Sequence, residues 1–467
     1  MATKRDLVEA HAFSRRRLVT AFVSGAPGGR EVEPARPGRT IVGGAALGVL
    51  LLAGAAVSGV LAGRTEVDWN NPGLVISKEK GQPYVITRES KHPVLNPVIN
   101  ITSARLVLGS SMEPVIVPEK TIQEQTIGAE IGILGAPATV PDTGELVETG
   151  WTACTATHRG IRTYVAPTPD ASYADGDGFV VQSGGARYLI ATSAAGTGAY
   201  RYRLPPSAGG AQDRFLQSVG LGVGNEAVRV SSQWLDLWPA GGDLAWQSFG
   251  IPGSAYGQAL SYADQIHVPQ ARVGDLVQVD DIGYLLGPDG PIRLSAFAQG
   301  VYEASTPPTG GFRTFDQPTM DRDAVVSPFA AANWPEGRLT PAADELCAVL
   351  QTSAGSRPEV ALATDPGDLA TADGVEKGRR DAGVASRAGA YVLSADFTQA
   401  TRGLPYLVDL KGNSHVLEGG AAERLGFTSY DAPVVPDTWV KLFPTGAVLS
   451  PSLALCQPAK TDPKGCS

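Results

Sequence analysis

Four cysteines are the residues of this 467-residue chain whose chemistry is easiest to assign: Cys154, Cys347, Cys456 and Cys466. An even number of cysteines in an exported region indicates two disulfides, with three possible pairings. We favour a Cys154–Cys347 bond, which would tie distant segments together. The remaining pair would close a short terminal loop. A zinc site is the competing interpretation, but the chain contains no CxxC spacing.

Motifs for catalysis or nucleotide binding are absent from the sequence. It has no GxxxxGK[ST] loop and no Gly-Lys pair at all, no GxSxG elbow and no HExxH pair. The glycine-rich stretch Gly220–Glu226 lacks the last glycine of a dinucleotide loop and follows an expected helix, so we interpret it as a turn. The five histidines are scattered. We therefore predict no catalytic, cofactor-binding or metal-binding residues, no cofactor and no enzyme, although distant residues can still meet in a triad.

An uncharged run of 24 residues, Thr40–Gly63, lies between Arg39 and Arg64. As a helix it would be about 36 Å long, enough to cross a hydrocarbon core of about 30 Å. A cleaved signal peptide is the alternative, but its apolar part is usually about 7–15 residues long and follows a short basic segment. We expect a retained transmembrane helix.

The charge distribution predicts the orientation of this helix. Residues 1–39 contain eight basic and four acidic residues, and residues 64–467 carry a net charge of −13. The positive-inside rule then places the N-terminus in the cytoplasm and the bulk of the chain on the periplasmic side of the inner membrane. The acidic exterior also argues against a nucleic-acid partner.

The N-terminal segment has the spacing of an amphipathic helix with interspersed basic residues. We expect this helix to dock on a partner or on the inner leaflet; the alternative is a partly ordered topogenic segment. The expected docking residues are Leu7, Phe13, Arg15, Arg16, Arg17, Leu18 and Phe22.

Small residues four apart recur in the transmembrane run, at Gly44 and Gly48 and at Gly59 and Gly63. Such spacing lets helix backbones approach closely in lipid. We consider these glycines a packing surface for a neighbouring helix, with the alternative that glycine is simply common in membrane helices.

The exported part contains four similar hairpin-like stretches, each an apolar strand led by tyrosine, a polar turn and a second strand. They begin at Pro83, Arg187, Tyr284 and Pro405. Two of them continue alike, with the motif of Trp234, Leu237, Trp238, Pro239 and Gly241 recurring 205 residues later as Trp439, Leu442, Phe443, Pro444 and Gly446. Each repeat is expected to pack on a neighbour, with the aromatic residues in the core.

We expect an α+β, mainly β extracytoplasmic part, in which a central β-rich, barrel-like domain is flanked by four small repeat units. The expected divisions are a cytoplasmic segment 1–39, transmembrane helix 40–63, repeat 1 at 64–125, central domain at 126–182, repeat 2 at 183–247, central domain again at 248–280, repeat 3 with a return to the central domain at 281–352, a linker at 353–390, repeat 4 at 391–455 and a tail at 456–467.

Several segments together resemble the EccB family, membrane-anchored components of type VII (ESX) secretion systems in actinobacteria. They are RDLVEAHAFSRRRLVTAFV, HPVLNPVINITSARLVLG, IGAEIGILGAPATVP, WTAC and the closing LGFTSYDAPVVPDTWVKLFPTGAVLSPSLAL. These segments run from residue 5 to residue 455. The short NPVIN stretch and residues 353–387 depart from the family pattern.

The resemblance implies one transmembrane helix, an extracytoplasmic part with four repeats and a core disulfide between Cys154 and Cys347. It also implies self-association and three kinds of partner: an FtsK/SpoIIIE-type motor ATPase, a multi-span channel subunit and the mycosin protease. ATP hydrolysis has been suggested for the family, but we do not carry it over because the chain lacks a phosphate-binding motif. The expected function is that of a structural secretion subunit; a membrane-tethered hydrolase or nucleotidase and a cell-wall-binding module are the alternatives.

Overall fold

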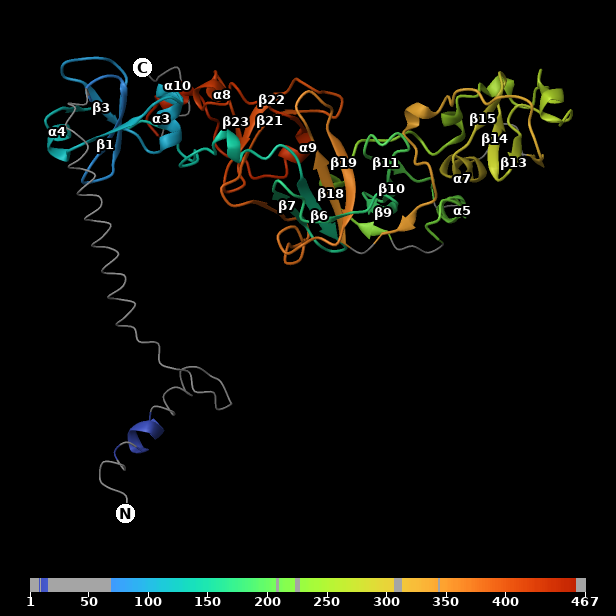
Figure 1. Ribbon diagram of the computed structural model, residues 1–467, viewed down its shortest axis with the longest axis horizontal. Coiled ribbons are helices and arrows are strands. Elements are labelled where there is room, and N and C mark those ends of the chain that lie inside the picture. The colour runs from blue at the N-terminus through green and yellow to red at the C-terminus, as the bar shows by residue number, and fades with distance from the viewer. Residues whose placement is uncertain are drawn as a thin grey trace. The chain divides into compact units, whose positions relative to one another are not determined.

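The computed structural model describes residue 8 and residues 10–15, 69–206, 210–222, 227–305, 313–342 and 345–458 (Figure 1). The chain divides into two compact units, Met1–Val67 and Asp68–Ser467. In the first unit, residues 8 and 10–15 are helical. The predicted transmembrane segment lies outside the described residues, and no helix within them is long and apolar enough to cross a membrane.

Four small sheets in the second unit share one strand order. Each has three antiparallel strands, then a helix, then a fourth strand that lies parallel to the first. The first sheet comprises β1 (Gly73–Ser77), β2 (Pro83–Ile86), β3 (Val94–Pro97), helix α3 (Ile101–Leu108) and β4 (Pro114–Val117), followed by α4 (Glu119–Gln123) and β5 (Thr126–Ile127). The second comprises β9 (Asp177–Ser183), β10 (Ala186–Thr192), β11 (Ala199–Arg203), α5 (Ala211–Ser218) and β12 (Val228–Arg229), with β17 (Thr340–Pro341) also on β9.

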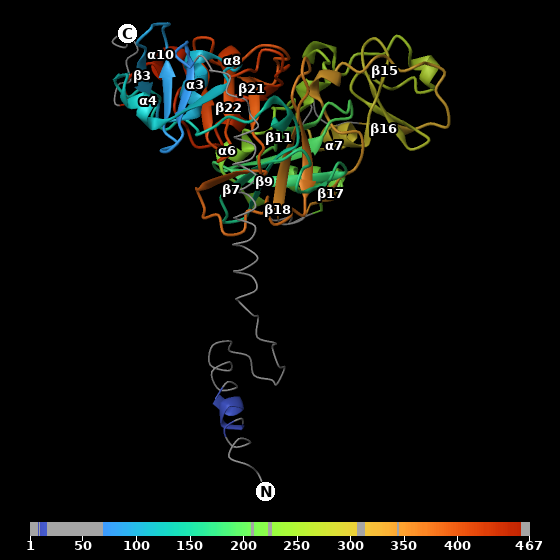
Figure 2. The same ribbon diagram turned by 60° about the vertical axis from the view of Figure 1, so that its left-hand side comes forward.

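The other two small sheets follow the same order. The third comprises β13 (Leu276–Val279), β14 (Ile282–Leu286), β15 (Pro291–Arg293), α7 (Ala296–Ala304) and β16 (Thr314–Asp316). The fourth comprises β21 (Ala390–Ala395), β22 (Leu404–Val408), β23 (Ser414–Val416), α8 (Ala421–Arg424) and β24 (Val434–Pro436); β21 and β22 lie side by side in Figure 2. The four hairpins recognised in the sequence are the second and third strands of these sheets.

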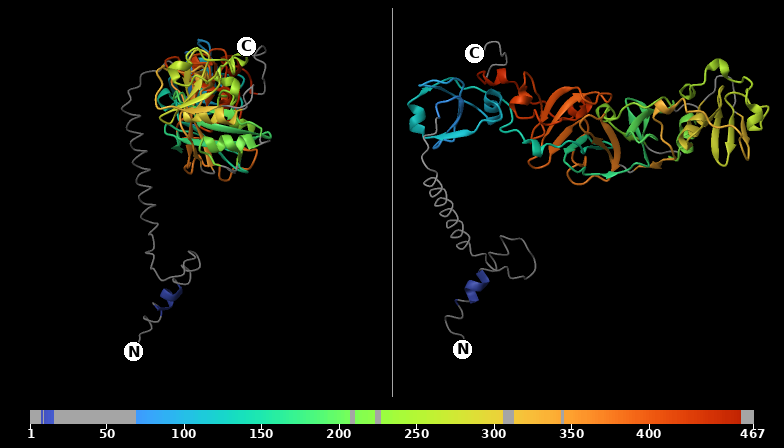
Figure 3. Two further views of the ribbon diagram at one scale, coloured as in Figure 1. Left: turned by 90° about the vertical axis from the view of Figure 1, so that its right-hand side faces the viewer. Right: turned by 45° about the horizontal axis from the view of Figure 1, so that its top comes forward.

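The remaining long strands form a six-stranded sheet in the order β20-β7-β6-β18-β19-β8. Its members are β6 (Trp151–Ala156), β7 (Ile161–Val165), β8 (Ser172–Tyr173), β18 (Glu345–Gln351), β19 (Glu359–Thr364) and β20 (Arg380–Val384). Figure 3 shows early strands in teal beside late strands in orange. We expected a barrel-like domain. In the part of the chain that the structure describes, β20 and β8 are the two ends of the sheet and do not pair with each other.

The prediction of a linker at 353–390 is wrong, because strands β19 and β20 lie within this range. Strand β19 is almost wholly buried, so its residues do not alternate between polar and apolar. Strand β20 is a polar edge strand that pairs with β7 in parallel. Neither strand therefore has the period-two pattern by which a half-buried strand is recognised.

Two further boundaries differ from the prediction. Strand β9 begins before residue 183, and β13 lies within the 248–280 segment that we assigned to the central domain. Both strands are the first of their small sheets. The recurring tyrosine lies in or just before the second strand of each small sheet, so the repeat visible in the sequence does not include the first strand.

Short helices connect the sheets. They are α6 (Ser232–Leu235), α9 (Asp437–Val440), α10 (Pro451–Ala454) and the 3-10 turns η1 (Thr143–Glu145), η3 (Trp246–Phe249), η4 (Gly253–Ala255), η5 (Ala263–Ile266) and η6 (Ala330–Ala332). Strand β6 is buried on both faces, and the core around it includes the apolar residues of α6 and α9. The largest members of this core are Trp151, Phe179, Trp234, Trp238, Trp439 and Phe443.

Candidate functional site

The residues predicted to contact membrane partners lie mostly outside the described part of the chain. Phe13 and Arg15 are described, and the Phe13 side chain is 60% exposed on its helical segment. The other predicted docking residues, Leu7, Arg16, Arg17, Leu18 and Phe22, lie outside the described residues, as do Gly44, Gly48, Gly59 and Gly63. Their roles stay predictions.

The cysteines join strands of the central sheet. Cys154 on β6 and Cys347 on β18 are register partners and form a disulfide with a Cα–Cα distance of 4.0 Å. Both are fully buried. Cys456 is also disulfide-bonded, and Cys466 lies outside the described residues. The Cys154–Cys347 bond links residues that are 193 positions apart in the sequence, so it cross-links two adjacent strands in the core of the sheet.

The repeated aromatic motif belongs to the core. Trp234 in α6 donates its indole N–H to the carbonyl oxygen of Ala153 in β6 at 3.0 Å, and Trp439 in α9 donates to Leu237 at 3.2 Å. Both tryptophans are fully buried. These side chains position the ends of the small sheets against the central sheet and are not available to a ligand.

The glycine of each motif lies against an aromatic or imidazole ring from the third strand of its sheet. A Cβ added at Gly241 would lie 2.1 Å from the ring of Tyr202, and one added at Gly446 would lie 2.3 Å from the ring of His415. Backbone bonds match too, because Arg201 N–H donates to Pro239 and Ser414 N–H donates to Pro444, each at 2.9 Å. Tyr202 and His415 therefore occupy equivalent places.

His415 is the buried histidine of this fold. Its Nε2 lies 3.2 Å from the Asp409 carboxylate and its Nδ1 lies 2.9 Å from the Ala447 carbonyl oxygen. The Asp409 carboxylate also accepts hydrogen bonds from the backbone N–H groups of Lys411 and Asn413. With both side chains at most 4% exposed, the pair braces the β22–β23 turn and presents no reactive group to solvent.

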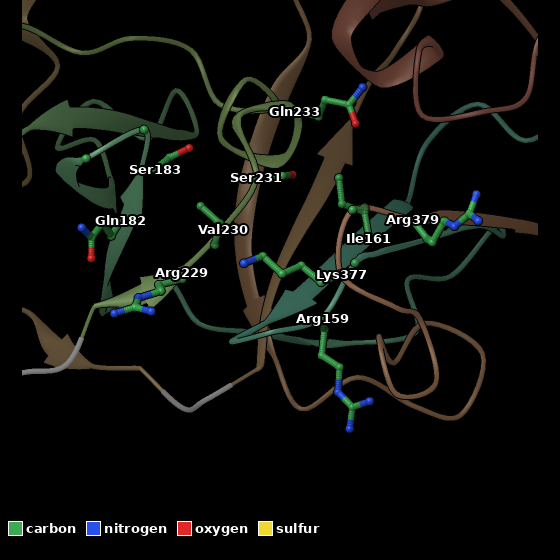
Figure 4. Close-up of a pocket in the computed structure, with 14 residues that line it drawn as sticks. Arg159, Ile161, Gln182, Ser183, Arg229, Val230, Ser231, Gln233, Lys377 and Arg379 are labelled. Atoms are coloured by element: carbon green, nitrogen blue, oxygen red, sulfur yellow. The ribbon is translucent and has the colours of Figure 1, made fainter.

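A pocket lined by basic side chains is the candidate binding site among the described residues. It has a volume of about 320 Å³, and fourteen residues from separate segments line it (Figure 4). Its cations are Arg159, Arg229, Lys377 and Arg379, and none of the described residues that line it is acidic. We use "basic pocket" for this site. No local sequence pattern marks this pocket, because its basic residues come from three segments that are far apart in the chain.

One wall of the basic pocket comes from the second small sheet. Arg229 on β12 is the parallel register partner of Gln182 on β9, so their side chains are neighbours on one face. The β9–β10 turn at Gly184 and Gly185 has positive φ at both residues, which glycine adopts without strain. After β12 the chain continues into Ser231, whose hydroxyl accepts the N–H of Trp234 and caps α6.

The opposite wall is the loop before β20. Gly160 N–H donates to Val375 and Ile161 N–H donates to Arg379, each at 3.0 Å, so the loop lies against the start of β7. A Cβ at Gly160 would fall 2.3 Å from the Arg379 carbonyl oxygen, which explains the glycine. These contacts fix the backbone that carries Lys377.

The four cations differ in how they face the pocket. In Figure 4 the Lys377 side chain extends across the opening toward Val230, while Arg159 and Arg379 extend outward at the rim. Arg159 also pairs with Asp373 at 3.1 Å. In the part of the chain that the structure describes, no carboxylate pairs with Arg229, Lys377 or Arg379. The pocket thus carries uncompensated positive charge.

Metal binding has no support in the described residues, which hold no group of three or more His, Cys, Asp or Glu side chains arranged to bind an ion. The acidic pair Asp280 and Asp281 lies exposed in the β13–β14 turn, both at positive φ. That placement fits a solvated turn.

Comparison with known families gives one match across nearly the whole chain. The sequence model of the family described as "Type VII secretion system ESX-1, transport TM domain B" matches residues 1–460. A relative in Mycolicibacterium smegmatis, "ESX-1 secretion system ATPase EccB1", is 25% identical over 91% of this chain and 90% of its own length. A relative in Mycobacterium tuberculosis, "ESX-2 secretion system ATPase EccB2", is 26% identical over 58% of this chain. The chain spans about half of that relative, 54%.

Solved structures share the fold. A chain of the intact ESX-5 inner membrane complex aligns with a TM-score of 0.60 at 20% identity, covering 99% of this chain and 96% of that one. The EccB3 dimer from the ESX-3 core complex aligns with a TM-score of 0.61 at 20% identity, covering 82% of this chain and all of that one.

Proposed function

The chain belongs to the EccB family of type VII (ESX) secretion systems, and we propose that it is a structural core subunit of such a system's inner-membrane complex. The match over residues 1–460 is the observation that carries this proposal. Its role is to anchor the periplasmic part of the complex in the membrane and to shape it for protein export.

The proposed topology has one membrane span. Residues 1–39 lie in the cytoplasm, 40–63 cross the inner membrane, and the rest of the chain is periplasmic. The basic N-terminal segment and the acidic remainder support this orientation. The disulfide between Cys154 and Cys347 is consistent with an oxidising compartment.

The proposed partners are the other membrane components of the system: the FtsK/SpoIIIE-type motor ATPase, the multi-span channel subunit and the mycosin protease. We also propose self-association. Support comes from the structural neighbours, which are chains of an ESX-5 inner membrane complex and of an EccB3 dimer. The N-terminal helix and the glycines of the membrane span would contact partners within the membrane region.

We propose that the four small sheets are repeats that act as a scaffold around the central sheet. Their shared strand order supports this division. The equivalent backbone bonds to Pro239 and Pro444 support it further for the second and fourth sheets. Repeated units provide several similar surfaces, which suits a subunit that contacts several neighbours.

We propose that this role is structural, without catalysis. The relatives carry the word ATPase in their names. This sequence lacks the lysine-bearing phosphate loop by which many ATPases hold the β- and γ-phosphates. Phosphate release from ATP by the purified full chain, abolished by a single substitution, would contradict the proposal.

Copurification tests the proposed role. The full chain is extracted from its native membrane in mild detergent, and the proteins that accompany it are identified by mass spectrometry. We expect the other membrane components in stable amounts. Gly48→Leu and Gly59→Leu should reduce their recovery, whereas Gly48→Ala and Gly59→Ala, which keep a small residue, should not. A chain that emerges alone and monomeric would contradict the proposal.

A further inference from the structure

We propose that the basic pocket binds the phosphate group of a small phosphorylated ligand. The structural role above needs no such site, so the inference goes beyond it. The pocket's volume of about 320 Å³ falls within the range of small-molecule sites, which is about 300–1,000 Å³.

Charge is the first argument. The chain as a whole has a net charge of −9, yet this pocket gathers four cations from three segments of the sequence. Like charges brought together repel one another, and only Arg159 has a carboxylate partner among the described residues. A bound anion would supply the missing compensation for Lys377 and Arg229, two exposed cations that line the pocket and have no carboxylate partner among the described residues.

The number and direction of donors favour phosphate over a carboxylate. A phosphate monoester carries about −1.5 to −2 charges at neutral pH and three acceptor oxygens, whereas a carboxylate has one charge and two oxygens in a plane. Here the donors come from opposite walls, with Arg229 and Gln182 on one and Lys377 on the other. Ser183 and Ser231 also line the pocket. Guanidinium groups bind phosphate through paired hydrogen bonds.

The scaffold holds the backbone segments that carry these groups in place before any ligand arrives. Trp234 fixes the segment after Arg229 to strand β6 through its 3.0 Å bond to Ala153. Backbone bonds from the Gly160 and Ile161 N–H groups hold the Lys377 loop against the start of β7. A preformed site loses little conformational freedom on binding. All four cations are exposed, so they also provide long-range attraction for an anion.

Binding of defined phosphates to the full chain in detergent tests the proposal. The probes are inorganic phosphate and glycerol 3-phosphate, with acetate as the carboxylate control, all measured by titration calorimetry at one ionic strength. We expect Arg229→Gln with Lys377→Gln to weaken phosphate binding at least tenfold, and Arg379→Gln at the rim to weaken it about two- to threefold.

The matched control is Arg357→Gln with Arg402→Gln, which removes the same charge from exposed positions outside the pocket. We expect this control to bind phosphate like the unchanged chain. Equal affinity of the two double variants, or acetate binding as tight as phosphate, would overturn the proposal. Tighter binding of glycerol 3-phosphate than of inorganic phosphate would assign an organic phosphate; equal binding would assign the free anion.

A second measurement needs no variant and so does not depend on folding. Exposed lysines of the unchanged chain are acylated with and without phosphate, and each site is quantified by mass spectrometry. Phosphate should protect Lys377 several-fold and leave exposed Lys411 unchanged. Equal modification of Lys377 in both conditions would overturn the proposal. Neither result depends on whether the chain copurifies with the secretion complex, so the two proposals fail separately.

Discussion

Trp439 donates its indole N–H to the carbonyl oxygen of Leu237, at 3.2 Å and across 202 residues of sequence. The two residues belong to the two copies of the same motif, one after the second small sheet and one after the fourth. Both side chains are buried in the core that surrounds β6. The two motifs therefore contact each other directly. Residues of both motifs pack in the core of the central sheet, although they are about 200 residues apart in the sequence.

Trp439→Phe tests this connection. The substitution keeps an aromatic ring but removes the N–H, so the Leu237 carbonyl loses this buried donor. We expect the free energy of unfolding to fall by about 1–3 kcal/mol. Urea unfolding of the purified chain, followed by circular dichroism, measures it. The control is Tyr173→Phe, an exposed position on the edge strand β8. Equal effects of the two substitutions would contradict a role for the bond.

Removing the disulfide should destabilise the central sheet. By the loop-entropy relation, a bond across a loop of 193 residues contributes about 5 kcal/mol through the unfolded state. We expect Cys154→Ala with Cys347→Ala to lower the melting temperature markedly. Because both cysteines are fully buried, a reductant should act on the unchanged protein only as it unfolds. Rapid reduction of this bond in the native protein, read by thiol alkylation, would contradict the burial.

Asp409 contributes to the stability of the fourth small sheet, and this contribution depends on pH. Burial alone would raise the pKa of its carboxyl group, but hydrogen bonds from His415, Asn413 and the Lys411 backbone outweigh burial and hold the pKa below 3.8. The folded state thus binds the proton less readily than the unfolded state. The contribution is complete above pH about 4 and is lost as the pH falls through the folded-state pKa.

Asp409→Asn should therefore reduce stability at neutral pH, and the difference from the unchanged protein should shrink below pH 3.8. Unfolding midpoints measured across this range test it. The control is Asp431→Asn, an exposed carboxylate of the same sheet region. A difference that is constant with pH would show that Asp409 acts through packing rather than through its charge.

Gly241 and Gly446 are predicted to tolerate no side chain. The Tyr202 and His415 rings occupy the space that a Cβ would need, so Gly241→Ala and Gly446→Ala require a shift of a buried ring. We expect each to cost about 1–3 kcal/mol of unfolding free energy. Gly337→Ala is the matched control, since nothing lies within 4 Å of a Cβ there. A neutral Gly446→Ala would show that His415 can move freely.

The sequence allowed some of this arrangement to be predicted. The hairpins at Pro83 and Pro405 were visible because each has a short apolar strand led by tyrosine, followed by a polar turn and a second strand. The motif of Trp439 was visible because large buried aromatics recur at fixed spacing. In contrast, β19 was missed because both its faces are buried and its residues do not alternate.

The basic pocket could not be predicted for a different reason. Arg229 lies on β12, which pairs with β9, and Lys377 lies in the loop before β20, which pairs with β7. The two residues line one pocket because these two sheets pack in a common core. No local pattern records that proximity, because the parallel register of short edge strands is set by the packing of the whole fold. The order of the central sheet was equally hidden, since β6 and β18 are almost 200 residues apart.

We propose above all that this chain is a structural core subunit of the secretion complex. The most direct test is to deplete it from its native cell and measure the size of the secretion complex in detergent-solubilised membranes by native gel electrophoresis. We expect the large complex to disappear while its other subunits remain in the membrane, and to return when the full chain is restored. A complex of full size and full subunit content in the absence of this chain would contradict the account.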